Sequence, residues 1–508
     1  MFYNVEIQGT IDGASLFCSI TLDSGTGRMV VIHAGPVEGQ RNTGDSSGMS
    51  TADVVVCGAG IAGICVAHAL SVGHGLRVVL VDERSPMSLT SDKSTEAYRN
   101  WWPGPDDAMI RFMNRNIDLL EQFAESSGNR FMMNRRGYLY ATADVSKVDD
   151  MMQSARLAEA QGAGPIRVYR SAGDASSYQP SAHMGFAEHP NGADVFLDRD
   201  AIATHFPSLS RDIVALLHAR RCGWFSGQQL GMQLLDEARA AGTTFVSGRV
   251  GSVDVTGGRV QSVRVDADRG TAVEISTNAF VNCAGPFAKQ VAGLLGVSLP
   301  LFSELHFKAA FEDHLAAIDR NTGLVILDDA QVLDWSDEER AELASDDATR
   351  PFTTQMPAGV HFRPEGYRNS TTVLMLWDYH SDHHFDEPEL PLPEDPFYPE
   401  IVMRGLVRAV PALAPYVDRL PHCIVDGGYY TKTRENRPLI GALPVEGAYI
   451  SAAFSGFGLM AAPAAGELIA AQIAGGALPD YASAFAPSRY DDPEYQQRLA
   501  SWGSTGQL

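Results

Sequence analysis

The clearest hydrophobic pattern of the chain lies between residues 51 and 84. A continuous apolar run, Val54 to Cys57, is followed by a glycine-rich turn, by the helix-like segment IAGICVAHALSVG, and by a second apolar run that ends in Asp82. Runs that are apolar at every position are typical of parallel strands buried on both faces. The segment therefore predicts a strand, a helix and a second strand in one parallel βαβ unit.

Helical and strand-like patterns then alternate along the chain. Apolar positions at helical spacing predict helices, and apolar or alternating runs between turn residues predict strands. The expected helices are 107–128, 145–162 and 229–242, and the expected strands are 243–255, 259–267 and 274–285. Gly257 and Gly258 predict a hairpin turn between the first two of these strands.

The second half of the chain has a different character. Strands of antiparallel type are expected at 306–313, 359–366 and 371–380, around a charged insertion in which Ser336 and Glu339 predict a helix start. A strand at 449–456, a glycine turn and an Ala-rich helix come next, before a polar tail. Residues 1–50 show only short alternating runs and a polar linker, so we expect an N-terminal appendage there.

Composition narrows the class of protein. The formal net charge of −23 disfavours nucleic acid and anionic membrane surfaces as partners. The six cysteines form no CxxC pair, which favours free thiols in a reducing cytoplasm, and no metal site is expected. The apolar segment 459–478 is interrupted by Pro463, Glu467 and Gln472, so no transmembrane segment is predicted. We expect a soluble cytoplasmic enzyme that acts on a small molecule.

The turn between the first two predicted strands carries candidate chemistry. Gly58, Gly60 and Gly63 form a GxGxxG motif, in which the first glycine permits a tight turn, the second lets the backbone approach a pyrophosphate, and the third lets helix and strand pack closely. Asp82 ends the second strand and suits the hydroxyls of a ribose. These residues predict a dinucleotide site without choosing between NAD and FAD.

A second motif near the C-terminus makes that choice. A strand leads into Ser455, Gly456, Phe457 and Gly458 and then into a helix, and the segment VNCAGPFA occupies 281–288. With the first glycine turn, these motifs resemble the D-amino-acid oxidase (DAO) superfamily of FAD-dependent oxidoreductases, in the branch of glycine oxidase and sarcosine oxidase. The resemblance covers roughly residues 51–480. It implies FAD as the cofactor.

The resemblance also implies a fold, a domain organisation and a set of cofactor residues. The fold is α/β, with a Rossmann-like FAD-binding domain interleaved with an α+β substrate domain on a mostly antiparallel sheet. The FAD-binding domain would comprise 51–145, 223–298 and 422–480, and the substrate domain 146–222 and 299–421, with a C-terminal tail at 481–508. The residues expected at the cofactor are Gly58, Ala59, Gly60, Ile61, Ala62, Gly63, Asp82, Glu83, Arg84, Thr90, Ser91, Ser94, Val250, Gly285, Gly456, Phe457, Gly458, Leu459 and Met460.

The mode of FAD attachment also follows from the resemblance. Some relatives link FAD to a His after the second strand, or to a Cys before the final glycine turn. This chain has no His between Arg84 and Asn100, and Gly428 stands at the Cys position. We therefore expect non-covalent FAD.

The chain departs from the family at the substrate site. Tyr430 stands where glycine and D-amino-acid oxidases have a carboxylate-binding Arg, and Glu96 stands where sarcosine oxidase has an Arg over the flavin. A replacement for that Arg is sought among nearby cations, and aromatic and histidine side chains are expected around the reacting face. The catalytic candidates are Arg99, Tyr430, Lys432, Arg363 and His306, with Lys93 as a further cation and Tyr98, Trp101 and Trp377 as further neighbours of the reacting face.

The function implied is oxidation of a C–N bond in an amine or amino acid, with hydride transfer to flavin N5 and hydrolysis of the imine. Two alternatives stay open: a 2-hydroxyacid-type C–O dehydrogenase with His306, His361 or His380 as base, and a non-catalytic flavin-binding partner subunit. Leu376 stands at the position of the Lys that helps oxygen react in sarcosine oxidase. The electron acceptor is therefore left open between oxygen, a quinone and a carrier flavoprotein.

Overall fold

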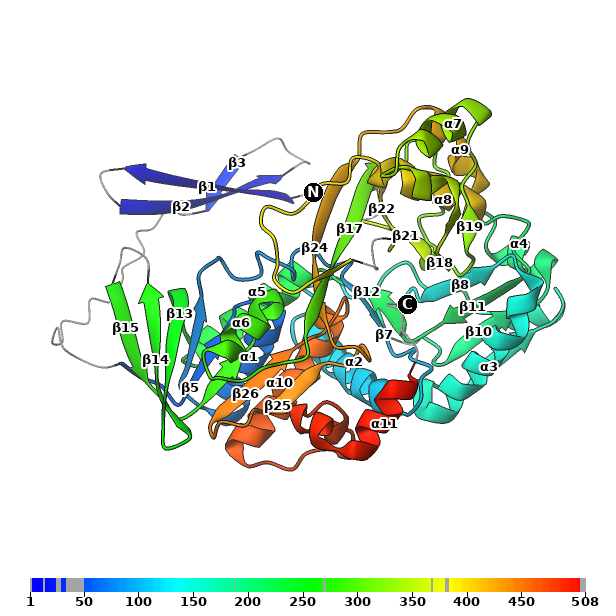
Figure 1. Cartoon of the computed structure of the whole chain (residues 1–508). Coiled ribbons are helices and arrows are strands. Elements are labelled where there is room, and N and C mark those ends of the chain that lie inside the picture. The colour runs from blue at the N-terminus through cyan, green and yellow to red at the C-terminus, as the bar shows by residue number, and fades with distance from the viewer. Residues whose placement is uncertain are drawn as a thin grey trace. The chain divides into compact units, whose positions relative to one another are not determined.

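The computed structural model describes residues 2–11, 14–23, 29–32, 50–187, 189–267, 271–366, 369–379 and 383–502. The chain divides into two compact units, Met1–Met49 and Ser50–Leu508. In the first unit, β1 (Phe2–Ile11), β2 (Ala14–Asp23) and β3 (Met29–Ile32) form an antiparallel sheet. The second unit contains the motifs of interest (Figure 1).

The predicted βαβ unit lies at the centre of a nine-stranded sheet. Its strands β5 (Val54–Cys57) and β6 (Val78–Asp82) pair in parallel and are joined by α1 (Ile61–His74). The sheet order is β25-β26-β16-β5-β6-β13-β14-β15-β4. The other bounds are β25 Leu439–Ala442, β26 Ala448–Ala452, β16 Phe280–Asn282, β13 Thr244–Thr256, β14 Arg259–Ala267, β15 Thr271–Ser276 and β4 Ser50–Thr51.

One expected strand is in fact two. The sequence pattern predicts a single strand over residues 274–285, but β15 ends at Ser276 and β16 begins at Phe280. β15 pairs antiparallel with β14, whereas β16 pairs in parallel with β5 and β26, so the chain must change partners between them. The apolar pattern does not record that change, because both segments are apolar on their buried faces.

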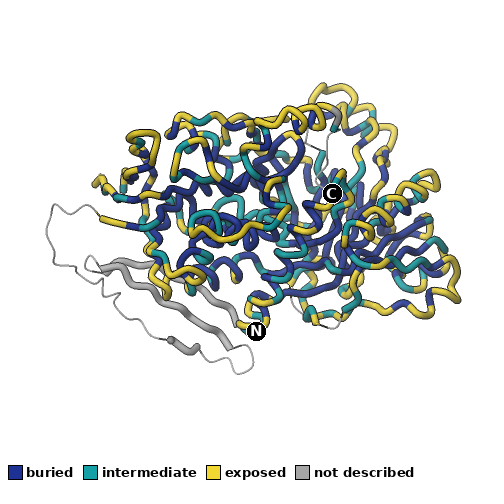
Figure 2. The backbone as a smooth tube through the Cα atoms, turned by 90° about the horizontal axis from the view of Figure 1, so that it is seen from below, coloured by how far each residue is buried: buried dark blue, intermediate teal, exposed yellow. Residues whose placement is uncertain are grey.

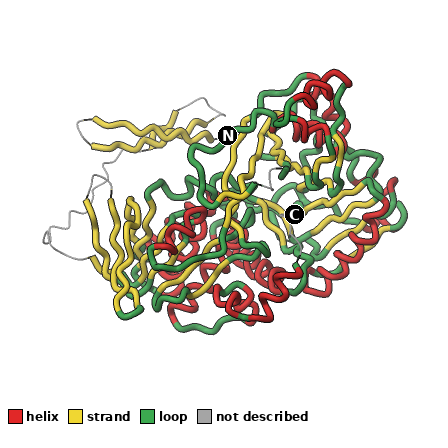
Figure 3. Tube along the Cα trace, in the orientation of Figure 1, coloured by secondary structure: helices red, strands yellow, loops and turns green. Residues whose placement is uncertain are grey.

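A helical layer buries the inner face of this sheet. Apolar side chains of α1 pack with those of α2 (Ala108–Ser126), α5 (Gly227–Ala240) and α10 (Gly458–Ala474) in one continuous core. On the other face, a second core includes side chains of α6 (Ala288–Gly293) and of the β13–β14 hairpin. Figure 2 shows that much of the backbone of this unit is buried, and Figure 3 shows its helices packed beside the strands.

The second sheet is mostly antiparallel. Its order is β23-β17-β22-β21-β18-β8-β11-β10-β9, and β24 pairs β17 in addition. The bounds are β23 His384–Phe385, β17 Phe302–Glu312, β22 Thr372–Leu376, β21 Val360–Pro364, β18 Leu324–Leu327, β8 Tyr138–Thr142, β11 Ala215–Ala219, β10 Ala193–Phe196, β9 Ile166–Tyr169 and β24 Ile424–Lys432. Strands β8 and β24 come from segments that we expected in the FAD-binding part. The long β17–β24 pair leads from this sheet back to the second glycine turn.

The remaining helices flank the second sheet or follow the first. They are α3 Val148–Ala158, α4 Arg199–His205, α7 Asp337–Ser345, α8 Tyr398–Ala409, α9 Ala414–Asp418 and α11 Pro493–Ser501. Ser336 caps α7 in the predicted capping box with Glu339. Two short strand pairs complete the fold, β7 (Ala97–Arg99) with β12 (Cys222–Trp224) and β19 (Gln331–Val332) with β20 (Gln355–Met356).

The C-terminal segment is more than the polar tail that the sequence indicated. Its Arg489 is buried and donates to Oε1 of Glu435 at 2.8 Å, and the hydroxyls of Tyr490 and Tyr495 donate to the same oxygen. These contacts fix the segment against the loop that follows β24. Among the described residues, no helix combines the length and the apolar character needed to cross a bilayer.

Candidate functional site

The first glycine turn has the geometry of a close-fitting cradle. Gly58 has φ +107°, and a Cβ placed there would lie 2.3 Å from the carbonyl oxygen of Cys283. A Cβ on Gly63 would lie 1.8 Å from the carbonyl oxygen of Gly58. Both positions therefore exclude a side chain for reasons internal to the fold.

Gly60 differs from its two neighbours in the motif. Its backbone is extended, with φ −72° and ψ −179°, and its Cβ would meet only the hydroxyl of Ser91, at 3.1 Å. The fold itself thus tolerates a small side chain at this position. The open space beside Gly60 is where a pyrophosphate would approach the N-terminus of α1.

The acidic end of β6 braces this turn. Asp82 accepts the backbone N–H of Ala59 at 2.7 Å and that of Arg84 at 2.8 Å. Glu83 lies between the guanidinium groups of Arg84 and Arg249, whose hydrogen bonds and charges hold the pKa of its carboxyl below the usual range. Asp82 therefore holds the glycine turn from within, and each of its oxygens keeps a second lone pair for a ribose hydroxyl.

The loop after β6 joins the first glycine turn to β24. Ser91 accepts the backbone N–H of Ile61 at 3.0 Å, so its hydroxyl lies at the N-terminus of α1. Thr90 donates to the carbonyl oxygen of Tyr429 at 3.3 Å. A Cβ on Gly428 would lie 3.1 Å from Cβ of Lys93, which places position 428 against this loop.

A cavity brings the separate motifs together. Ala453 and Ser455 have φ of 61° and 50°, and this bent segment ends where α10 begins, at Gly458. The lining combines the first turn, the loop after β6, the segment after β16, the end of β24 and the second turn. From the predicted set, the cavity is lined by Gly60, Ile61, Ala62, Thr90, Ser91, Ser94, Gly285, Tyr430, Gly456, Gly458 and Leu459.

Four predicted cofactor residues have their side chains in packed cores. Val250 lies in the core between the sheet and α6. Ala59, Phe457 and Met460 lie in the helical core, and the ring of Phe457 meets that of Trp102 edge-on at 5.0 Å between centroids. These residues support the cradle from behind, and only their backbone could face a cofactor.

The lining of the cavity has the chemistry of a dinucleotide site. The N-termini of α1 and α10 both open onto it, and unpaired N–H groups at a helix start favour negative charge. One helix would hold the phosphates and the other the electron-rich edge of the ring system. Fold and cradle together define a dinucleotide-binding protein with a second, antiparallel sheet over its site.

Comparison with known families agrees with this class. Residues 53–472 match the model of the FAD-dependent oxidoreductase (DAO) family, and the chain therefore belongs to this family. It is an FAD-dependent oxidoreductase. The resemblance inferred from the two glycine turns is confirmed.

Solved structures share the fold at low sequence identity. L-proline dehydrogenase from P. horikoshii has a TM-score of 0.64 at 18% identity, covering 87% of this chain and 98% of its own. Glycine oxidase from Geobacillus kaustophilus has a TM-score of 0.64 at 13% identity, covering 87% and 99%. L-amino acid deaminase from Proteus vulgaris, with its specific insertion deleted, has a TM-score of 0.62 at 16% identity, covering 88% and 96%. No curated protein sequence matches the chain.

At the wall of the cavity, Tyr430 is backed by a charged cluster. Its ring stacks on His306 with 3.9 Å between centroids. His306 contacts Glu304 through Nε2 at 3.2 Å and Asp378 through Nδ1 at 3.0 Å. Lys432 donates to Glu304 at 2.9 Å. Glu304 thus joins two predicted residues, His306 and Lys432, and Asp378 contacts the other nitrogen of His306. Sequence reasoning missed both carboxylates.

Arg99 lies near the second glycine turn. Its guanidinium donates to the hydroxyl of Tyr140 at 3.1 Å and stacks over the ring of Trp102 at 4.2 Å. Trp102 in turn contacts Phe457 of the second glycine turn. Arg99 is therefore linked to the second glycine turn through the ring of Trp102.

The guanidinium of Arg363 contacts neighbouring groups of the protein. Its Nε and Nη2 donate to the carbonyl oxygen of Thr95 at 3.1 and 2.8 Å, and its Nη1 pairs with Glu365 at 2.5 Å. The side chain is 1% exposed. Glu96, next to Thr95, accepts the backbone N–H of Gly227 at 2.7 Å. These contacts hold Arg363 against the loop that contains Thr95.

Three aromatic residues expected at the reacting face lie in packed cores. Trp377 is 1% exposed within the core of the second sheet, and its indole N–H donates to the carbonyl oxygen of Pro357. Tyr98 is fully buried and donates to the carbonyl oxygen of Asn134, and Trp101 packs in the core beside α3. The sequence does not distinguish an aromatic residue of the core from one that lines an active site, because both kinds are buried. His380 lies outside the described residues.

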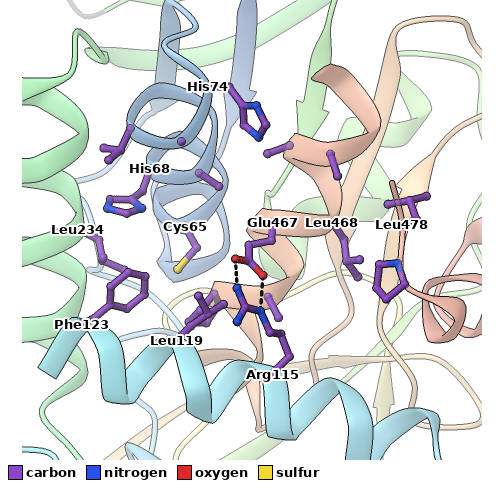
Figure 4. Close-up of a pocket in the computed structure, with 18 of the residues that line it drawn as sticks. Cys65, His68, His74, Arg115, Leu119, Phe123, Leu234, Glu467, Leu468 and Leu478 are labelled. Carbon is purple, nitrogen blue, oxygen red and sulfur yellow. Dashed lines mark hydrogen bonds and ion pairs between the residues drawn. The ribbon is translucent and has the colours of Figure 1, made fainter. Parts of the chain in front are cut away.

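A larger cavity lies on the helical layer, away from these groups. It has a volume of about 830 Å³ between α1, α2 and α10, and its lining is mostly apolar (Figure 4). Arg115 and Glu467 form a two-bond ion pair within it, at 2.8 and 2.6 Å. His68 in its lining contacts Glu237 at 2.8 Å, and none of the predicted catalytic residues line this cavity.

Proposed function

We propose that this enzyme oxidises the C–N bond of an amino acid or a related secondary amine. The observation that carries the proposal is the charged cluster behind Tyr430, at the wall of the cavity. Arg99, which Trp102 links to the second glycine turn, adds a cation on a different element. An α-amino acid carries one anionic and one cationic group, so a site with both a guanidinium and carboxylates suits it. Similar structures carry the names proline dehydrogenase, glycine oxidase, L-amino acid deaminase and iminodiacetate oxidase, which supports this substrate class.

In this proposal, Arg99 binds the substrate carboxylate. A guanidinium matches a carboxylate with two parallel hydrogen bonds, and stacking on Trp102 fixes its plane. Tyr430 borders the cofactor cavity, and stacking on His306 holds its ring in place. When bound, FAD supplies the hydride acceptor. The protein contributes orientation and charge around the reacting carbon.

A second candidate function is oxidation of a C–O bond. His306 lies beside Tyr430, where such a reaction needs a base, and L-α-glycerophosphate oxidase from Mycoplasma pneumoniae has a similar fold. The contacts of His306 with two carboxylates favour a protonated imidazole, which is a poor base. We therefore rank this candidate second.

Anaerobic flavin bleaching tests both candidates. The purified enzyme would be mixed with glycine, sarcosine, L-proline, iminodiacetate, simple amines and 2-hydroxy acids while the flavin spectrum is recorded. Bleaching by amino acids alone supports the proposal, and bleaching by hydroxy acids alone contradicts it. In Arg99→Lys, which keeps the charge but loses the paired donors, we expect KM for the amino acid to rise about tenfold with a smaller change in kcat.

The electron acceptor is tested on the same sample. Admitting oxygen, a soluble quinone or an electron-transfer dye to the bleached enzyme shows which one restores the oxidised spectrum. Because Leu376 stands where sarcosine oxidase has its oxygen-activating Lys, we propose a quinone or a carrier flavoprotein as the acceptor. Rapid recovery with oxygen alone would contradict that choice.

A further inference from the structure

The lining of the cofactor cavity includes a fully buried hydroxyl group. Ser451, on β26, is 0% exposed and lines this cavity. Among the described residues, no hydrogen-bond partner lies within reach of its Oγ. Buried polar side chains are nearly always paired, so an unpaired one in the wall of a ligand cavity points to a partner on the ligand. Ser451 is absent from the residues that the sequence predicted at the cofactor.

The pleat of β26 determines which way Ser451 points. Its neighbours Ile450 and Ala452 pack in the core on the α6 side of the sheet. Since successive side chains of a strand point to opposite faces, Ser451 points to the other face, on which α1 and α10 lie. The N-termini of both helices open onto the cavity. The hydroxyl therefore faces the same side of the sheet as the two helix starts.

The register of the sheet places Ser451 in one row with the first glycine turn. On the parallel strands β6, β5, β16 and β26, the register partners nearest the carboxyl ends are Val81, Cys57, Asn282 and Ile450. The residues that follow them form the next row, in the order Asp82, Gly58, Cys283 and Ser451. Neighbouring strands are about 4.8 Å apart, so Ser451 lies about 10 Å from Gly58 and about 14 Å from Asp82.

A dinucleotide that binds across the carboxyl ends of these strands passes the members of this row in turn. Asp82 suits the ribose of the adenosine half, and the turn from Gly58 to Gly60 suits the pyrophosphate. Ser451 lies on the opposite side of the pyrophosphate site from Asp82, and the chain continues from it into the second glycine turn. The ribityl chain is the part of FAD that follows the pyrophosphate on that side, and its hydroxyls can pair with a serine.

Other small polar side chains of the lining have partners within the protein. The hydroxyls with such a partner include those of Thr90, Ser91, Ser94 and Thr431. Cys283, which precedes Ser451 in the row, is a weak donor, and burial raises the pKa of its thiol, so it stays uncharged. In this row, the hydroxyl of Ser451 is therefore the side-chain donor best suited to a neutral oxygen of the ligand.

We propose that Ser451 is a cofactor-binding residue whose hydroxyl forms a hydrogen bond with a ribityl hydroxyl of FAD. The contact holds the chain that joins the pyrophosphate to the ring system, and so restricts where the ring can lie in the cavity. It depends on FAD alone and is independent of which substrate the enzyme oxidises.

Loss of this hydroxyl affects the FAD-free and FAD-bound protein differently. Within the described part of the chain, Ser451→Ala removes no hydrogen bond, so the unfolding temperature of the FAD-free protein should not fall. In the holoenzyme the same substitution removes a bond to FAD, and we expect the Kd for FAD to increase about tenfold. A serine that served only the fold would show the reverse.

Deoxyribityl analogues of FAD identify the partner atom. The wild type and Ser451→Ala are loaded by exchange with FAD or with an analogue that lacks the 2′, 3′ or 4′ hydroxyl of the ribityl chain. Each holoenzyme is diluted, and Kd is obtained from the fluorescence of the released flavin. We expect the difference between the two proteins to persist with two of the analogues and to fall below about twofold with the third, because that ligand lacks the partner of Ser451.

Ser71→Ala is the matched control. Ser71 is 2% exposed, and its hydroxyl donates to the carbonyl oxygen of Ala67 within α1, at 2.7 Å. It lines neither cavity. The same loss of a buried hydroxyl should therefore leave the Kd for FAD within about twofold of the wild type. Thermal unfolding of the FAD-free and FAD-bound forms is recorded for all three proteins.

Each outcome decides for or against the contact. A weaker Kd in Ser451→Ala, with the difference abolished by one deoxy analogue, supports it. A Kd for FAD within about twofold of the wild type overturns it. A difference that persists with every analogue places the lost bond at a phosphate or a water molecule, and overturns the ribityl contact. A lower unfolding temperature of FAD-free Ser451→Ala shows that the hydroxyl serves the fold, which also contradicts the proposal.

Discussion

The Gly60→Ala variant is expected to separate cofactor binding from folding. Gly60 has an extended backbone that alanine adopts readily, and the new Cβ meets only the Ser91 hydroxyl at 3.1 Å. We therefore expect the free energy of unfolding of the apoprotein to change by less than about 1 kcal/mol. The same methyl group occupies the space that a pyrophosphate needs at the N-terminus of α1.

The expected loss of FAD affinity follows from overpacking. Forcing a methylene-sized group into a fitted space costs about 1–3 kcal/mol, which corresponds to roughly a 5- to 150-fold increase in Kd. The assay is fluorescence titration of FAD with apoprotein, alongside thermal unfolding of the apo form. FAD affinity equal to the wild type would refute the assignment of the phosphate site.

Two further glycines provide controls. Gly73 lies in α1, and a Cβ added there would have nothing within 4 Å, so Gly73→Ala should keep FAD affinity and stabilise the helix by about 0.5–1 kcal/mol. Gly58→Ala combines a φ of +107° with a backbone contact of 2.3 Å, so it should destabilise even the apoprotein, by about 2–4 kcal/mol. If Gly60→Ala destabilises the apoprotein as much as Gly58→Ala, Gly60 is needed for folding as well as for FAD binding, which contradicts the prediction.

Three other predictions concern single contacts. Asp82→Asn places an amide where two backbone N–H groups now donate, so FAD content after purification should fall, as flavin absorbance per protein will show. Glu435→Gln leaves buried Arg489 without its counter-charge and should lower stability by about 3–5 kcal/mol in denaturant unfolding. Burial alone would raise the pKa of Glu435, but Arg489 holds it below the usual range. The stabilisation from the Glu435–Arg489 pair is therefore present above about pH 4.5 and is lost as pH falls. Unfolding measured between pH 3 and about 7 will check this. Ser336→Ala removes the capping box with Glu339 and should lower the free energy of unfolding by about 1 kcal/mol. An unchanged thermal unfolding curve would contradict this prediction.

Much of the fold was predictable because its signals are local. The hairpin at Gly257 and the capping box at Ser336 each depend on residues a few positions apart, and the βαβ unit is contained in one continuous segment, residues 54–82. The errors fall where a segment changes partners, as between β15 and β16, or where it gains structure from distant residues. The C-terminal segment is the second kind, because buried Arg489 is fixed by Glu435.

The cofactor site, like the predicted elements, depends on local motifs, whereas the substrate site depends on contacts between residues far apart in the sequence. By itself, the sequence determined the family and the cofactor, because a glycine turn is a steric requirement of the backbone that a short motif records. The tertiary structure alone decided that Arg363 anchors a loop, that Trp377 is a core residue, and that Asp378 faces His306. Pairing of charges from different strands depends on the register of the sheet, and no local pattern encodes it.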